Sequence, residues 1–369
     1  MMNVIASIGV GPFDTSLLSQ ALILATPILL AGIGELISER AGIINVGLEG
    51  MMLSGAFFAY LITWRTHSLA LGCLAGMGGG LIFGVAMGLL AIEAGADQIV
   101  AGVAIDLAAL GLTGFMFEQI FQNMSQIVVP TVGNIAIPGL SKIPSFGPAL
   151  FDHDPLLYLA FLLVPLSWFL LYRTRWGLAI RAAGELPMAA DSAGISVRRL
   201  RWFGVLTAAA LAGLAGADLS IVQDGIFHEN LSAGLGYLAL VAVIFGRWRS
   251  LGVLAAALVL GGANALQLRV GEQPYIQAAF WGAIALIAFG LLGGELLPGR
   301  GKVRVSTVSI TGVVGIAAVV LLIAQPHISL SQPLWVGFPY VVALLVLAGG
   351  RTSARMPSAM AMPYQRGQR

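Results

Sequence analysis

Eleven runs of mostly apolar residues, separated by short polar segments, fill most of this sequence. A helix needs about 20 such residues to cross the hydrocarbon core of a bilayer. The runs cover residues 17–38, 43–63, 68–92, 98–121, 155–172, 202–222, 234–246, 251–268, 276–294, 305–324 and 334–349. Because the runs are continuous and do not alternate with polar residues, they predict helices and not the strands of a β-barrel. We therefore expect an all-α, polytopic transmembrane bundle of about nine to eleven spans.

The amino-acid composition is also that of a protein embedded in a lipid bilayer. Only 10% of the residues are charged and 58% are hydrophobic, whereas an ordinary soluble domain carries about 25% charged residues. The same figures exclude a disordered chain, which would be polar and charged. The formal net charge of +2 is too small to suggest a nucleic-acid partner, and the single cysteine, Cys73, excludes an internal disulfide.

Two of the runs are weak candidates for a full crossing. The second, 43–63, contains Asn45 and Glu49, and the seventh, 234–246, has only 13 residues. Either could be a broken or re-entrant helix, which lipid tolerates where other protein segments cover the free backbone.

Lysines and arginines decide the orientation, because they gather in the cytoplasmic loops of membrane proteins. With eleven spans and an outside N-terminus, sixteen of the nineteen lysines and arginines fall on the cytoplasmic side. We therefore expect a multi-pass protein of the cell membrane. Residues 1–350 would form one transmembrane domain and residues 351–369 a basic cytoplasmic tail. No basic residue precedes the first apolar run, so we expect no cleaved signal peptide.

The cytoplasmic loop at 173–201 has the pattern of a short helix between two arginine-rich segments. Pro187 fits the first turn of a helix, and Glu185 precedes it at the positive end of the helix dipole. Gly194 can supply a left-handed cap at the other end. A helix of about two turns is not stable alone and needs a surface to pack against. The alternative is an ordinary arginine-rich loop without a special role.

Four polar residues inside the predicted spans are candidates for the lining of a substrate pathway, because a charge within a span is costly and needs a reason. They are Asn45, Glu49, Asp106 and Asp218. Asn45 and Glu49 are four residues apart and would share a face of a helix. The alternative is that these side chains bind broken backbone or neighbouring helices. We find no pattern of catalytic residues and no spacing of metal ligands, so no catalytic site, metal or bound cofactor is expected.

Several passages resemble the membrane-spanning permease subunits of ATP-binding-cassette (ABC) importers, in the branch that serves sugars, nucleosides and branched-chain amino acids. The passages are 26–57, which includes SERAGIINVGLEG, 98–115, the loop RAAGELPMAADSAGI at 181–195, 237–269, and the tail with FPYVVALLVLAGG and AMPYQRGQR. The greatest likeness within the branch is to nucleoside and simple-sugar permeases. No lysine or arginine lies in the middle of a span, which also favours a neutral solute.

The resemblance implies a division of labour among subunits. Two cytoplasmic ABC ATPases would bind ATP and magnesium, a second permease, identical or related, would complete the pathway, and an extracytoplasmic protein would deliver the substrate. The short helix of the inner loop would dock into the ATPase, formed here by Gly184, Glu185, Pro187, Ala190, Asp191 and Gly194. This chain has no phosphate-binding loop, because its Gly301-Lys302 pair is followed by Val303. A transporter driven by an ion gradient is the alternative.

Overall fold

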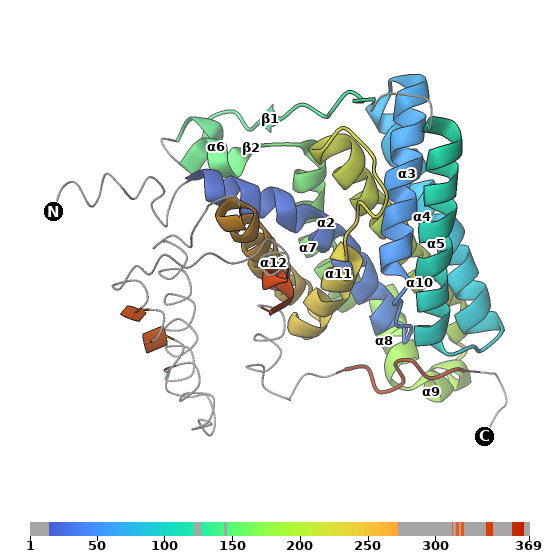
Figure 1. Cartoon of the computed structure of the whole chain (residues 1–369). Coiled ribbons are helices and arrows are strands. Elements are labelled where there is room, and N and C mark those ends of the chain that lie inside the picture. The colour runs from blue at the N-terminus through green and yellow to red at the C-terminus, as the bar shows by residue number, and fades with distance from the viewer. Residues whose placement is uncertain are drawn as a thin grey trace, which may run out of the picture. The chain divides into compact units, whose positions relative to one another are not determined.

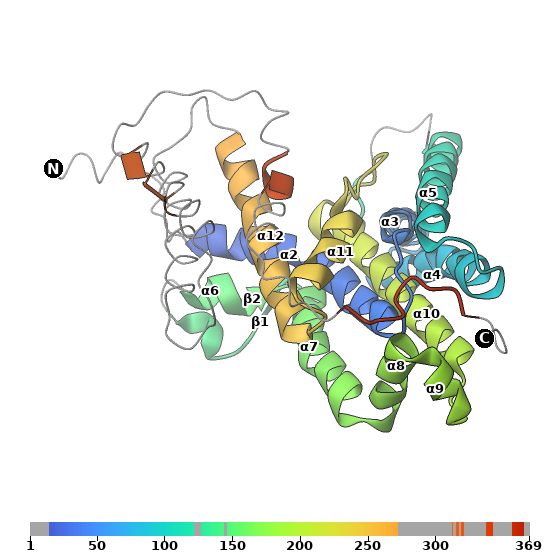
Figure 2. The same ribbon diagram turned by 90° about the horizontal axis from the view of Figure 1, so that it is seen from below.

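The computed structural model describes residues 15–121, 127–143, 146–271 and 356–364, and a few positions between 312 and 341. The chain divides into two compact units, residues 22–261 with 350–369 and residues 1–21 with 262–349. The larger unit holds every residue on which the function is argued below. Figures 1 and 2 show its helices.

The described elements are almost all helices. In chain order they are α2 (Thr15–Arg40), α3 (Leu48–Thr66), α4 (Leu69–Gly88), η1 (Leu89–Glu93), α5 (Gln98–Phe121), β1 (Ile135–Ala136), η2 (Leu140–Lys142), α6 (Phe146–Phe151), β2 (Asp152–His153), α7 (Pro155–Arg173), α8 (Arg175–Glu185), α9 (Pro187–Ser192), α10 (Val197–Ala217), η3 (Asp218–Gln223), α11 (Leu235–Phe245) and α12 (Ser250–Gly271). The short strands β1 and β2 pair antiparallel.

The predicted helical bundle is confirmed. Within the described residues, six helices are long and apolar enough to cross a membrane, namely α2, α4 with η1, α5, α7, α10 with η3, and α12. The second and seventh predicted segments correspond to α3 and to α11, which has only 11 residues. The last three predicted spans, 276–294, 305–324 and 334–349, lie outside the described residues apart from a few positions.

Helix α2 is buried along most of its length, as expected of a helix that is apolar on all sides. In its most apolar window, 83% of the residues are buried. Pro27 lies inside this helix and has no N–H to donate to the carbonyl of Ile23. The side-chain amide of Gln223, at the end of η3, donates a hydrogen bond to that carbonyl at 3.3 Å. A distant side chain thus replaces the bond that proline removes.

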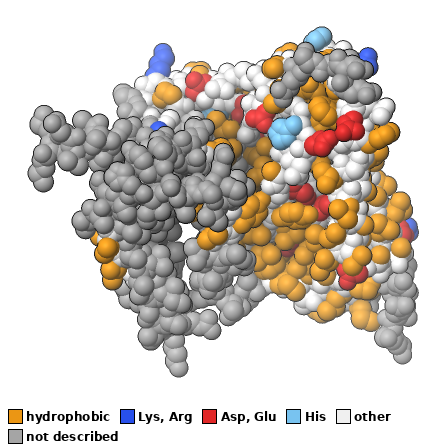
Figure 3. All heavy atoms as spheres, viewed as in Figure 1, with side chains coloured by type: hydrophobic (Ala, Val, Ile, Leu, Met, Phe, Trp, Pro, Cys, Tyr) orange, Lys and Arg blue, Asp and Glu red, His pale blue; other side chains and the backbone are white. Residues whose placement is uncertain are grey.

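Helices α3, α4, α5 and α10 lie side by side as a bundle (Figures 1 and 2). Four glycines of α4, spaced four residues apart from Gly76 to Gly88, lie close to α10. A Cβ atom at Gly80 would collide with the carbonyl oxygen of Ala209. Small residues at such spacing allow helix backbones to approach closely in a membrane. The outer face of α5, seen in Figure 3, is covered by hydrophobic side chains such as Ile99, Leu107 and Phe115.

Segments predicted to share one side of the membrane contact each other. At one end of the bundle, Arg198 binds Glu93 at 2.7 Å. At the other end, the N–H of Val129 donates to the carbonyl of Gly225 at 2.8 Å. These contacts agree with the alternation of the third to sixth predicted spans across the membrane.

Candidate functional site

The short helix predicted in the inner loop is present as α9. Pro187 occupies its first turn, and Leu186, the residue before proline, has the non-helical backbone (φ −142°, ψ 75°) that separates α9 from α8. At the other end Gly194 has a φ of +80°, and the N–H of Ile195 donates back to the carbonyl of Ala190 at 3.0 Å. This glycine-capped end is the one that the sequence predicts.

Helix α9 presents apolar side chains outward. Ala190 is 4% exposed and faces the rest of the protein, whereas Leu186 and Met188 are 66% and 56% exposed. The helix is too short to be stable without its neighbours, so the packing of Ala190 contributes to holding it in place. Leu186, just before α9, and Met188 within it thus form an exposed apolar surface at the arginine-rich end of the bundle.

The short helix is smaller than the resemblance implies, because it does not include Gly184 and Glu185. Gly184 and Glu185 belong to a preceding helix, α8, which runs without a break from Arg175. The hydroxyl of Thr174 caps the start of α8 by accepting a hydrogen bond from the N–H of Gly177 at 3.0 Å. Threonine before a stretch without proline is a signal for a helix start that could have been recognised in the sequence. The two helices together form one bent arm between α7 and α10.

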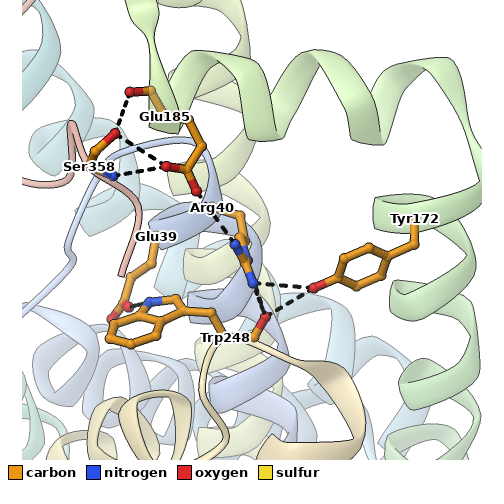
Figure 4. A network of polar contacts seen from close by, with 6 residues as sticks. All are labelled: Glu39, Arg40, Tyr172, Glu185, Trp248 and Ser358. Carbon is orange, nitrogen blue, oxygen red and sulfur yellow. Dashed lines mark hydrogen bonds and ion pairs between the residues drawn. The ribbon is translucent and has the colours of Figure 1, made fainter. Parts of the chain in front are cut away.

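Arg40, the last residue of α2, lies at the base of this arm (Figure 4). Its guanidinium group donates to the carbonyl of Trp248 at 3.1 Å and to the hydroxyl of Tyr172 at 3.2 Å. One nitrogen lies 3.9 Å from the carboxylate of Glu185. The indole N–H of Trp248 donates to Glu39, the neighbour of Arg40. The ends of α2, α7 and α8 and the turn before α12 thus meet at one junction.

Gly184 brings the backbone of α8 directly against the end of α2. A Cβ atom at this position would collide with the carbonyl oxygen of Arg40. Because backbone touches backbone here, a displacement of α8 cannot be absorbed by side chains and must move α2 or separate the two helices. The sequence, which placed Gly184 in the short helix, did not reveal this backbone contact.

Glu49, one of the predicted pathway residues, caps the start of α11. One of its carboxylate oxygens accepts hydrogen bonds from the hydroxyl of Ser232 at 2.6 Å and from the N–H of Gly234 at 2.7 Å. The other accepts from the N–H of Gly236 at 2.7 Å. The first N–H groups of a helix have no partner within the helix, and an acidic side chain near them is stabilising. The carboxylate is 8% exposed.

Asp106 lies in the middle of α5 and binds two other segments. It accepts a hydrogen bond from the N–H of Gly50 at 2.7 Å and from the hydroxyl of Tyr237 at 2.8 Å. Asp106 is 8% exposed, whereas Tyr237 is 41% exposed. Glu49 and Asp106 therefore join α3, α5 and α11, and Tyr237 is the member of this group that reaches the surface.

Asn45 does not share a helix face with Glu49, because α3 begins only at Leu48. Residues 43–45 are non-helical, and the N–H of Asn45 donates to the buried carboxylate of Glu35 at 2.8 Å. Asp218 is also buried and accepts a hydrogen bond from Gln223 at 2.7 Å. The alternative interpretation, that these side chains bind broken backbone and neighbouring helices, describes the contacts of Glu49 and Asp106. The side chains of Asn45 and Asp218 bind Met51 and Gln223, which lie close to them in the chain. Their role in lining a pathway stays a prediction.

Comparison with known proteins agrees with the architecture. The family described as the branched-chain amino acid transport system permease component matches residues 17–289. No solved structure matches the chain. A putative glucose ABC transporter permease of Haloferax volcanii (TsgC13) is 37% identical over 70% of this chain and 78% of its own length.

Two further relatives are named for nucleosides. A guanosine ABC transporter permease of Bacillus subtilis (NupQ) is 38% identical over 67% of this chain and 80% of its own length. A nucleoside ABC transporter permease of Lactococcus lactis (NupC) is 34% identical over 71% of this chain and 84% of its own length. Bacillus subtilis also has a second guanosine permease (NupP), which is 25% identical to this chain. These findings favour an ABC transporter over a carrier driven by an ion gradient. The chain therefore belongs to this permease family and is a membrane-spanning subunit of an ABC transporter.

Proposed function

We propose that this chain forms part of the membrane pathway of an importer that is driven by ATP hydrolysis on two cytoplasmic ATPase subunits, and that α9 is its contact with one of them. The observation that carries the proposal is α9 itself, a six-residue helix with an exposed Met188 and with the exposed Leu186 just before it. It lies at the end of the bundle to which the arginine count assigns the cytoplasm. Magnesium and ATP would bind to those ATPases.

Five of the six predicted coupling residues make structural contributions that fit this role. Pro187 starts α9, Gly194 ends it, and Ala190 packs it against the protein. Gly184 places α8 against the backbone of α2, and Glu185 faces Arg40. Asp191 lies in the last turn of α9. A movement of the ATPase would thus pass through α9 and α8 to the end of α2, which is packed among the spans.

The proposed cargo is a nucleoside or a simple sugar. Three relatives with more than 30% identity are named as permeases for glucose, guanosine and nucleosides. Asn45, Glu49, Asp106 and Asp218 would lie along or near the pathway, with Tyr237 presenting a hydroxyl and a ring at the surface beside Asp106. A ring and a hydroxyl group are suited to a hydroxyl-rich solute.

Further subunits would complete the transporter. The pair of guanosine permeases in Bacillus subtilis supports a second permease related to this chain. An extracytoplasmic binding protein would deliver the solute to the opposite end of the bundle from α9.

The test is uptake by the purified assembly in lipid vesicles. We expect accumulation of a radiolabelled nucleoside or sugar when ATP is supplied on the side of the ATPases, and the same accumulation after ionophores have collapsed the ion gradients. Uptake that needs a gradient and continues without ATP would refute the proposal. A matched control is the assembly with an ATPase that cannot hydrolyse ATP, in which accumulation should stop.

A further inference from the structure

A segment near the C-terminus crosses the base of the α8–α9 arm. Residues 356–364, here called the C-terminal strap, run beside the end of α8 and beside α10 (red in Figures 1 and 2). The strap has a turn at 358–361, and Ala359 and Met360 are only 6% and 9% exposed. A segment this close to the end of a chain is usually loose unless something ties it down. Its burial therefore needs an explanation.

The strap binds the last carbonyl groups of α8. The N–H of Ala359 donates to the carbonyl of Gly184 at 2.9 Å, and the hydroxyl of Ser358 donates to the carbonyl of Glu185. The N–H of Ser358 also donates to the Glu185 carboxylate at 3.2 Å (Figure 4). The last carbonyls of a helix have no partner within the helix. The strap supplies partners for two of them from a part of the chain about 170 residues away.

The other half of the strap binds the spans on either side of the arm. The N–H of Ala361 donates to the carbonyl of Gly42, just after α2, at 3.3 Å. The carbonyl of Met362 accepts from the guanidinium group of Arg201 in α10 at 2.9 Å, and that group lies 5.9 Å from the ring centre of Tyr364. Arg201 is 2% exposed, although the sequence places it among the loop arginines.

These contacts make the strap a tie between the arm and two helices of the bundle. The only ion pair between the arm and α2 in the described residues is Arg40–Glu185, at 3.9 Å and with the Glu185 side chain 42% exposed. An exposed pair at that distance contributes little. The hydrogen bonds of the strap are shorter, and those of Ala359 and Arg201 come from buried residues.

We propose that the C-terminal strap is a positioning element of the coupling machinery, which holds the end of α8 to α2 and α10 so that a displacement of α9 moves these spans. The proposal rests on the function proposed above, in which an ATPase acts on α9. Without the strap, the arm would follow the ATPase while the spans stayed behind. ATP would then be hydrolysed with less transport, because rigid-body transmission needs a packed connection.

Two truncations of the full transporter in lipid vesicles test the proposal. Ending the chain after Arg355 removes the strap, and ending it after Tyr364 keeps the strap but removes the last five residues. We expect the number of solute molecules moved per ATP to fall about tenfold in the first and to be unchanged in the second. A wild-type ratio in the first truncation would overturn the proposal.

Two point variants test the same proposal if the chain that ends after Arg355 does not assemble. Ser358→Ala loses the hydroxyl that donates to Glu185, whereas Ser358→Thr keeps a hydroxyl. We expect the ratio to fall about threefold in the alanine variant and to be restored in the threonine variant. Equal ratios in both would overturn the proposal.

A cross-link separates this proposal from the one on which it rests. Met188→Cys, made in a chain in which Cys73 is replaced by alanine, should cross-link to the ATPase in wild-type and strap variants alike. Absence of the cross-link in the chain with an intact strap would count against the ATPase contact itself. A cross-link together with a reduced transport ratio would support the strap as the element that transmits the movement.

Discussion

Replacing Glu49 by glutamine should destabilise the protein through the start of α11. The carboxylate accepts three hydrogen bonds, two at one oxygen and one at the other. In glutamine one oxygen becomes an NH₂ group, which would face the N–H of Gly236 or that of Gly234 donor to donor. Losing one hydrogen bond to a charged acceptor costs about 1.5–3 kcal/mol, and the remaining bonds weaken because the acceptor is no longer charged.

We therefore expect Glu49→Gln to lower the free energy of unfolding by roughly 3 kcal/mol. Since a loss of about 1 kcal/mol shifts the midpoint of a chain of this size by a few degrees, the melting temperature should fall by roughly 5 °C or more. The measurement is thermal unfolding of the purified protein in detergent, followed by its intrinsic fluorescence.

Glu118→Gln is the matched control, because Glu118 is an exposed carboxylate on α5. It should melt within about 1 °C of the wild type, as surface substitutions change stability little. Equal melting temperatures for Glu49→Gln and Glu118→Gln would refute the capping role. Normal stability with lost uptake would instead support Glu49 as a pathway residue.

Three further changes probe other contacts. Gly80→Leu should prevent assembly of the bundle, since even a Cβ there would collide with the Ala209 carbonyl. A normal yield of folded protein would contradict this. The control is Gly78→Leu, because a Cβ at Gly78 meets nothing within 4 Å. Gly184→Val should lower transport per ATP in vesicles while the spans still assemble, because it separates α8 from the end of α2; unchanged coupling would remove Gly184 from the mechanism. Tyr237→Phe deletes the hydroxyl that binds Asp106. It should lower the apparent affinity of uptake for the solute, with little loss of thermal stability. An unchanged affinity would exclude Tyr237 from the pathway.

The spans were predictable because the bilayer imposes one requirement on every segment that crosses it, a long apolar run with its backbone paired internally. The first eight predicted runs all correspond to helices in the structure. The start of α9 was predictable as well, since Pro187 acts locally on Leu186 through the backbone.

Contacts between distant segments were not predictable from one sequence. The amide groups of Gly234 and Gly236 carry no signal that a carboxylate 185 residues away will cap them. The strap binds largely through its own backbone N–H and C=O groups, which nearly every residue has. The sequence of the strap therefore carries no signal that predicts the contact. Asn45 was misplaced because the run 43–63 is mostly apolar from its first residue, and the break before Leu48 is supported by Glu35 from another helix.

The most direct test of the central claim is whether α9 touches the ATPase in the assembled transporter. A cysteine at Met188, 56% exposed on α9, should form a cross-link with the ATPase subunit, and one at Val128, 70% exposed at the opposite end of the bundle, should form none. A cross-link from position 128 and none from position 188 would contradict the account.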